Sequence, residues 1–314
     1  MLGYFFKRVL HGLPVILVVA TLTFLILRLV PGGPFDRDKK LPPEILANIE
    51  AKYHLDKTLA QQYLLYLKQV VKGDLGPSYK YVGRNVSDIL KETFPVSLTL
   101  GLCAVLVTLA LGIPAGVLSV VGRDTWIDRA CIFLATLGIS LPSFVIGTLL
   151  ILVFSHQLQW LPPALWEGPR HIVMPAFALG AGFAGYIARL TRSTLLEVME
   201  QDFIRTARAK GLRESTVILK HALINAASPI VSVMGPLTAG LVVGSFVIEY
   251  IFSIPGMGNY FITAVTNRDY PLIMGVTLVY AVLVVLANIL VDLVYIKLDP
   301  RVKLIESAGG GKKA

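Results

Sequence analysis

The residue types that carry enzyme chemistry are few in this chain, and they are not grouped. It has five histidines, at His11, His54, His156, His171 and His221. None of them pairs with an acid at a catalytic spacing. Cys103 and Cys131 lie in or beside apolar runs, a pattern that favours neither a metal site nor a structural disulfide. We therefore predict no catalytic, cofactor-binding or metal-ligating residue.

A nucleotide site is not expected either. The sequence contains no GxxxxGK[ST] phosphate loop, so the chain should not bind ATP by that route. One ionisable residue, Asp292, falls within an apolar run, where such groups are costly and often functional. Its position near the end of that run, about one turn from Lys297, favours a snorkelling or helix-pairing acid over an ion site. No series of acids indicates a proton-coupled carrier.

One charged stretch stands out in the second half of the chain, at residues 202–230, between long apolar runs. Its first part, from Phe203 to Leu212, fits a helix at about 100° per residue. The residues that share one face of this helix are Phe203, Ile204, Ala207 and Gly211. Ala207 and Gly211 leave little side-chain bulk there, which favours close docking against another surface. A solvated loop is the alternative, and Gly211 could end the helix in a left-handed conformation.

The elements around this stretch are those of a membrane protein. Of 314 residues, 55% are hydrophobic and only 16% charged, against about 25% charged in soluble proteins. The apolar residues gather in runs of about 20, the length that crosses a bilayer as a helix. The net charge of +9 does not indicate nucleic-acid binding. Much of the excess Lys and Arg lies beside spans on one side, where the positive-inside rule expects it.

Six apolar runs are expected to span the membrane. They lie at 9–30, 94–121, 130–154 (kinked at Pro142), 172–188, 226–248 and 272–296. The charge of the short loops places both termini in the cytoplasm. The predicted domains are the N-terminus with the first transmembrane helix (1–30), an extracytoplasmic domain (31–93), a five-helix transmembrane domain (94–297) and a cytoplasmic tail (298–314). The extracytoplasmic domain should contain helices at 43–55 and 59–71. Residues 189–225 are expected to form a cytoplasmic loop, and 249–270 an outer loop.

The charged stretch resembles the cytoplasmic coupling loop of the inner-membrane permease subunits of binding-protein-dependent ABC importers. The family motif is E-A-A, three residues, Gly, then a spaced I-x-L-P. In this chain Arg205, Thr206 and Ala207 occupy the triplet, Gly211 matches the glycine, and Leu223 matches the leucine. Arg and Thr replace the first two residues of the triplet, a departure usual in the peptide/nickel branch. Residues 41–81, 267–275 and 291–302 also resemble the oligopeptide permeases of that branch.

The resemblance implies a type I ABC importer fold and the role of a permease for oligopeptides. It implies as partners a second homologous permease subunit, two ATPase subunits that hold ATP and Mg, and an extracytoplasmic peptide-binding protein. The pathway for the peptide would lie between the two permease chains in a bacterial inner membrane. The residues that would couple to the ATPases are Phe203, Ile204, Arg205, Thr206, Ala207, Arg208, Gly211, Leu212 and Leu223.

Alternatives remain within and outside this family. Dipeptides, glutathione or nickel are possible substrates in the same branch. An ion-coupled secondary transporter is a second class, against which the scarcity of ionisable groups in the spans and the lack of a visible inverted repeat both argue. A membrane-embedded enzyme is a third class, and no catalytic constellation favours it.

Overall fold

The computed structural model describes residues 2–35, 51, 53–243 and 245–298, with side chains over 8–35, 51, 53–243 and 245–290. In this part of the chain the regular structure is helical, with one isolated β-bridge between Pro77 and Asn85. Five described helices are long and apolar enough to cross a membrane, or six if the bent segment 126–157 counts as one span. The prediction of an all-α polytopic membrane protein is confirmed.

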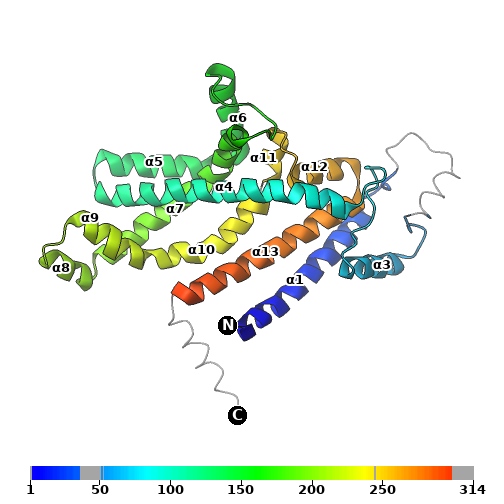
Figure 1. Cartoon of the computed structure of the whole chain (residues 1–314), viewed down its shortest axis with the longest axis horizontal. Coiled ribbons are helices and arrows are strands. Elements are labelled where there is room, and N and C mark those ends of the chain that lie inside the picture. Colours follow the sequence, from blue (N-terminus) through cyan, green and yellow to red (C-terminus); the bar gives the residue numbers. More distant parts are fainter. Residues whose placement is uncertain (1, 36–50, 52, 244, 299–314) are drawn as a thin grey trace, which may run out of the picture.

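The main helices form one bundle with two distinct ends (Figure 1). They are α1 (Leu2–Leu29), α4 (Val86–Val121), α5 (Trp126–Ser140), α7 (Pro169–Met199), α10 (Leu223–Val243) and α13 (Tyr270–Leu298). Helices α4, α5 and α7 run side by side, and α13 packs between α1 and α10. The short helices α8 (Asp202–Ala209) and α9 (Glu214–Thr216) lie at one end, and α12 (Met257–Asn267) lies at the other. We call these the α8 end and the α12 end.

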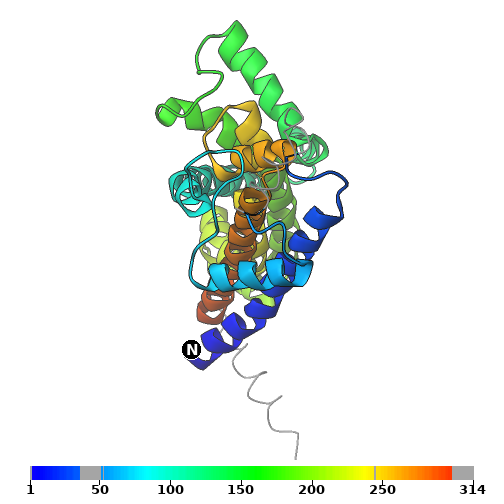
Figure 2. The same ribbon diagram turned by 90° about the vertical axis from the view of Figure 1, so that its right-hand side faces the viewer.

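The segment after α1 adds one further helix at the α12 end. Helix α3 (Leu59–Val71) has the predicted bounds and begins with a capping box between Thr58 and Gln61. It lies across the bundle in Figure 2. Its Tyr66 belongs to a buried apolar cluster with Phe24 of α1 and Met274 of α13. Most of the other predicted helix, 43–55, and the tail after 298 lie outside the described residues.

The third predicted span is broken rather than kinked. Helix α5 ends at Ser140, and α6 (Ser143–Leu150) continues into a π-helix, η1 (Ile151–Gln157), at 106° to α5. A proline disfavours helical backbone in the residue before it. Leu141, which precedes Pro142, is accordingly extended, with φ −90° and ψ 128°. The segment α6–η1 therefore stands off the bundle as an arm in both views (Figures 1 and 2).

Three other predicted segments have more helix in the structure than the sequence indicates. The long helix α4 begins at Val86 after an Asn85 cap, so residues 86–93 form its first turns, ahead of the predicted span. The expected loop 189–225 is largely helical. It contains the last turns of α7, then α8, α9, a π-helix η2 (Val217–Ala222) and the start of α10. The expected outer loop 249–270 instead forms the end of α11 (Phe246–Ile251) and all of α12.

Candidate functional site

The helix that the sequence singles out forms at the α8 end, and it ends at Ala209, three residues before the predicted Leu212. Asp202 lies in its first turn and Arg208 in its last, both placed favourably for the helix dipole. Gly211 follows with φ +76°, and its N–H donates to the carbonyl oxygen of Arg208 at 2.9 Å. The predicted left-handed glycine after the helix is thus confirmed, and it turns the chain toward α9.

One face of α8 is buried against the rest of the chain. Ile204 is fully buried and Ala207 is 7% exposed. Both belong to an apolar cluster that joins α8 to α4, α7, η2 and α10. Its buried members are Val120, Leu195, Val198, Ile204, Ala207, Val217, Ala222 and Ala226, with Leu223 packed against them. The prediction that Ile204 and Ala207 lie on an outward docking face is therefore wrong. The cluster already occupies that side of α8.

The opposite side of α8 faces outward. Phe203 and Leu212 are each 39% exposed. The other predicted coupling residues on this side are Arg205, Thr206, Arg208 and Gly211, all exposed. Two exposed apolar side chains from neighbouring elements, Leu219 and Ile224, were not singled out from the sequence. The outward surface of the α8 end thus combines apolar and basic side chains. We call it the α8 surface.

An ion pair fixes the turn after α8. The Arg208 guanidinium donates to both carboxylate oxygens of Glu214, at 3.1 and 2.5 Å, across the turn at Gly211. This hydrogen bond raises the pKa of Arg208 further above its ordinary value, although an arginine is charged at physiological pH in any case. Arg205 makes a looser contact with Asp202, 3.4 Å from Nη1 to Oδ1. Because these side chains are exposed, the pairs shape the α8 surface more than they stabilise it.

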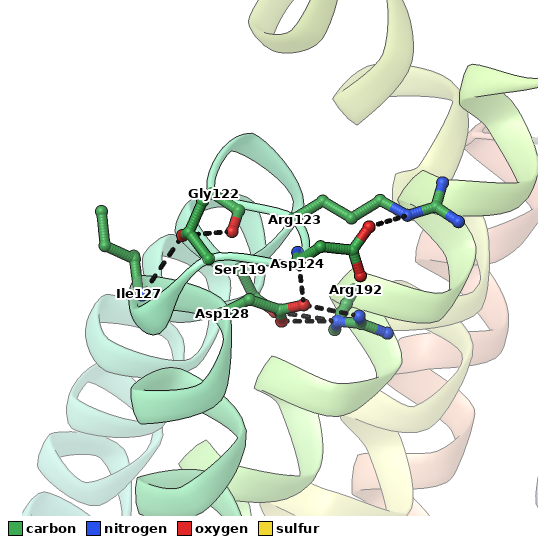
Figure 3. Close-up of polar contacts among 8 residues, drawn as sticks. Ser119, Gly122, Arg123, Asp124, Ile127, Asp128 and Arg192 are labelled. Carbon is green, nitrogen blue, oxygen red and sulfur yellow. Dashed lines mark hydrogen bonds and ion pairs between the residues drawn. The ribbon is translucent and has the colours of Figure 1, made fainter.

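A second charged group lies at the same end of the bundle, around the turn from α4 to α5 (Figure 3). Asp128 of α5 is 4% exposed, and Arg192 of α7 donates to its two carboxylate oxygens at 3.0 and 2.9 Å. The hydroxyl of Ser119, on α4, donates to the same carboxylate. Sequence reasoning did not single out these residues, since a short polar segment between two apolar runs is typical of an exposed turn.

Two more buried acids lie at the α12 end. Glu249 is fully buried and accepts hydrogen bonds from the Ser245 hydroxyl and the Gly258 N–H, at 2.5 and 2.7 Å. Asp269, also fully buried, accepts from the Ser78 hydroxyl and, at 3.1 Å, from the Tyr79 N–H. Both acids were placed in a loop by sequence reasoning. The side chain of Asp292, the one acid it did single out, lies outside the described residues.

The bundle also contains a cavity between α5, α6, α7 and α10. Its volume is about 640 Å³, and its lining is mostly apolar, with Ser143, Tyr186 and Ser232 as polar members. Ser143 lies within the predicted span 130–154. Among the described residues there is no group of three His, Cys, Asp or Glu side chains that could hold a metal ion. The cavity lining is therefore weakly polar.

Comparison of the sequence with known families shows which family this chain belongs to. A family model described as "Binding-protein-dependent transport system inner membrane component" matches residues 109–304. A model for the N-terminal part of such components matches residues 1–101. The chain belongs to this family. It is thus a membrane component of a binding-protein-dependent transport system, as the coupling-loop motif predicts.

The relatives of this family member match over nearly its whole length. Dipeptide transport system permease protein DppB of Bacillus subtilis is 46% identical over 304 residues, 97% of this chain and 99% of the relative. Oligopeptide transport system permease protein OppB of Escherichia coli K12 is 42% identical over 305 residues, 96% of this chain and 100% of the relative. An inward-facing structure of the MetNI methionine ABC transporter gives a TM-score of 0.58 at 18% identity. It covers 67% of this chain and 96% of that one, which supports the type I importer fold.

Proposed function

We propose that the chain is a permease subunit of an ATP-driven oligopeptide importer in the bacterial inner membrane. The observation that carries this proposal is the nearly full-length match, at 42% and 46% identity, to permeases named for oligopeptides and dipeptides. Such a match includes the segment between α1 and α4 as well as the helical bundle. Both termini and the α8 end would face the cytoplasm, and α3 and α12 the outside.

Two of the proposed partners would contact features already described, the cavity and the α8 surface. A second, homologous permease would complete the pathway. The residues that line the 640 Å³ cavity would form the wall contributed by this chain. Two ATPase subunits would hold ATP and Mg and dock against the α8 surface through Phe203, Leu212 and their basic neighbours. An extracytoplasmic peptide-binding protein would deliver the peptide. Selectivity would reside chiefly there, since an apolar contact discriminates by only about 1–3 kcal/mol.

Transport by the complete complex tests this function. The chain is reconstituted in liposomes with its second permease, its ATPases and its binding protein, and given tritiated trialanine. We expect uptake that requires ATP and the binding protein. Parallel assays with dialanine, glutathione and nickel ion distinguish the other substrates of the family. Uptake of nickel alone would contradict the peptide proposal, and uptake driven by an ion gradient without ATP would contradict the importer class.

The orientation has its own test. Single cysteines at Lys57 and Ser215, both exposed, are introduced after Cys103 and Cys131 are replaced by alanine. A membrane-impermeant thiol reagent added outside intact cells should label the cysteine at position 57 and leave the one at 215 unlabelled. The reverse pattern would show that the α8 end faces outward, where no ATPase could reach it.

A further inference from the structure

The Asp128–Arg192 ion pair at the α8 end joins three helices through one carboxylate (Figure 3). Asp128 lies in the first turn of α5, and Arg192 reaches it from α7 with two hydrogen bonds. Ser119, near the end of α4, donates to Asp128 and accepts from Nε of Arg192 at 2.9 Å. The backbone N–H of Asp124 lies 3.4 Å from the second carboxylate oxygen. The side chains of Asp128, Ser119 and Arg192 therefore each find hydrogen-bond partners in one another.

The same three helices pack backbone to backbone along their length. A Cβ added to Gly112 or Gly116 of α4 would lie 2.8 or 2.7 Å from a carbonyl oxygen of α7. One added to Gly138 of α5 would lie 2.9 Å from the carbonyl oxygen of Ala181, also on α7. Such contacts leave no room for one helix to shift against the next without separation. Helices α4, α5 and α7 thus form a stiff unit, and the ion pair closes it at the α8 end.

This unit connects the α8 surface with the cavity. Val120 follows Ser119 in the chain, and Leu195 lies one turn after Arg192. Both are in the apolar cluster that buries Ile204 and Ala207 of α8. Further along, α5 and α7 supply much of the cavity wall, including Gly138, Ile139, Phe183 and Tyr186. A displacement of α8 would therefore reach the cavity through the helices that Asp128 ties together.

Stability alone is a weak reason for a buried ion pair, because desolvation of the charges offsets much of their attraction. Apolar side chains of similar size could fill the same space. We propose that Asp128, Arg192 and Ser119 are positioning residues that hold α5 in register with α4 and α7, so that movement of α8 is transmitted to the cavity wall. This inference rests on the proposed importer function. It assigns to these three side chains a role in coupling and none in contact with peptide or nucleotide.

The test is the number of peptides imported per ATP hydrolysed by the reconstituted complex, with trialanine as the probe. In Asp128→Asn the bidentate charged contact is lost while side-chain volume is kept. We expect the complex to assemble and to hydrolyse ATP, but its import per ATP should fall about fivefold or more, the lower end of typical coupling effects. ATP hydrolysis in the absence of the binding protein should rise, because the activity of the ATPases would no longer depend on the conformation of the helices that line the cavity.

The matched control is Asp124→Asn, four residues earlier. The Asp124 side chain is 89% exposed, its ion pair with Arg123 is long at 3.7 Å, and its left-handed φ of 65° suits asparagine. This variant should import as many peptides per ATP as the unaltered complex. An equal loss in Asp124→Asn would overturn the proposal, because general disturbance of the α4–α5 turn would then explain the effect.

Two milder variants decide the matter if Asp128→Asn fails to assemble. Arg192→Lys keeps the charge and loses the planar two-point contact, and Ser119→Ala removes one hydroxyl from a helix. Both should reduce import per ATP in assembled complexes while the thermal unfolding midpoint changes little. If both assemble and retain the normal ratio, the cluster is only structural and the proposal is wrong. If the unaltered complex imports no trialanine, the proposed function fails instead.

Discussion

The two ends of the bundle hold their buried acids in different ways. At the α12 end Glu249 and Asp269 are surrounded by hydroxyl and backbone N–H donors. At the α8 end Asp128 is held by an arginine from another helix. Backbone donors are fixed by the local path of the chain, so the first arrangement secures turns and helix starts. An arginine–carboxylate pair instead connects two helices, and its strength depends on their register.

The comparison separates two kinds of defect. A change at the α12 end should reduce the amount of folded permease and leave assembled molecules coupled. A change at Asp128 should leave folded permease that is poorly coupled. The following variants test this distinction, from the largest expected effect on stability to the smallest.

Glu249→Ala should destabilise the permease most. The side chain is fully buried, and its removal leaves the Ser245 hydroxyl and the Gly258 and Asn259 N–H groups without their acceptor. Unsatisfied buried donors cost about 1–3 kcal/mol each. We expect a thermal unfolding midpoint well below that of the unaltered chain in detergent, and little assembled complex. Glu249→Gln keeps one acceptor oxygen, so its unfolding midpoint should lie between those of Glu249→Ala and the unaltered chain. Normal assembly of Glu249→Ala would contradict the importance of this acid.

Asp269→Ala should have an intermediate effect. The carboxylate ties the segment around Ser78 and Tyr79 to the start of α13, 190 residues away in sequence. Its loss should cost about 2 kcal/mol and speed amide hydrogen exchange at residues 78–81. Peptide import per ATP should stay normal in the complexes that do assemble. A fall in that ratio without a change in exchange would show that the α12 end also contributes to coupling. Asp269→Asn, which keeps one acceptor oxygen, is the milder control.

Arg208→Gln should have the smallest effect on stability. Its pair with Glu214 is 43% and 54% exposed, and exposed pairs contribute about 0–1 kcal/mol. Thermal unfolding of the purified chain should shift little, and any shift should shrink at high salt. A large, salt-independent loss of stability would show that the turn at Gly211 depends on this pair.

Much of the fold could be predicted from the sequence, because the length of an apolar run decides whether it crosses a membrane. The α3 bounds and the left-handed Gly211 also follow from local rules, since a capping box and a glycine act within a few residues. The orientation of α8 does not follow from local rules. Phe203 and Ile204 are adjacent and both apolar. Only packing against the apolar cluster around Val120 decides that Ile204 is the one that is buried.

The buried acids could not be predicted for a related reason. Glu249 and Asp269 lie between apolar runs, where charged residues are normally in solvated loops. Their burial depends on donors that the fold brings to them, such as Ser78 for Asp269. Asp128 likewise depends on Arg192, 64 residues later. The sequence lists these residues but does not say which of them lie close together in space. The coupling motif could therefore be predicted from the sequence, and the cluster of Ser119, Asp128 and Arg192 could not.

The most direct test of the account is Phe203→Asp, since it changes the α8 surface and not the cluster beneath it. Phe203 is 39% exposed and lies in the first turn of α8, where an acidic residue is compatible with the helix. We predict an unchanged unfolding midpoint for the permease chain, with loss of peptide-stimulated ATP hydrolysis and of trialanine uptake by the reconstituted complex. Phe203→Tyr, which keeps the ring, should retain both activities. Normal stimulated hydrolysis and uptake by the Phe203→Asp complex would contradict the assignment of the α8 surface to coupling.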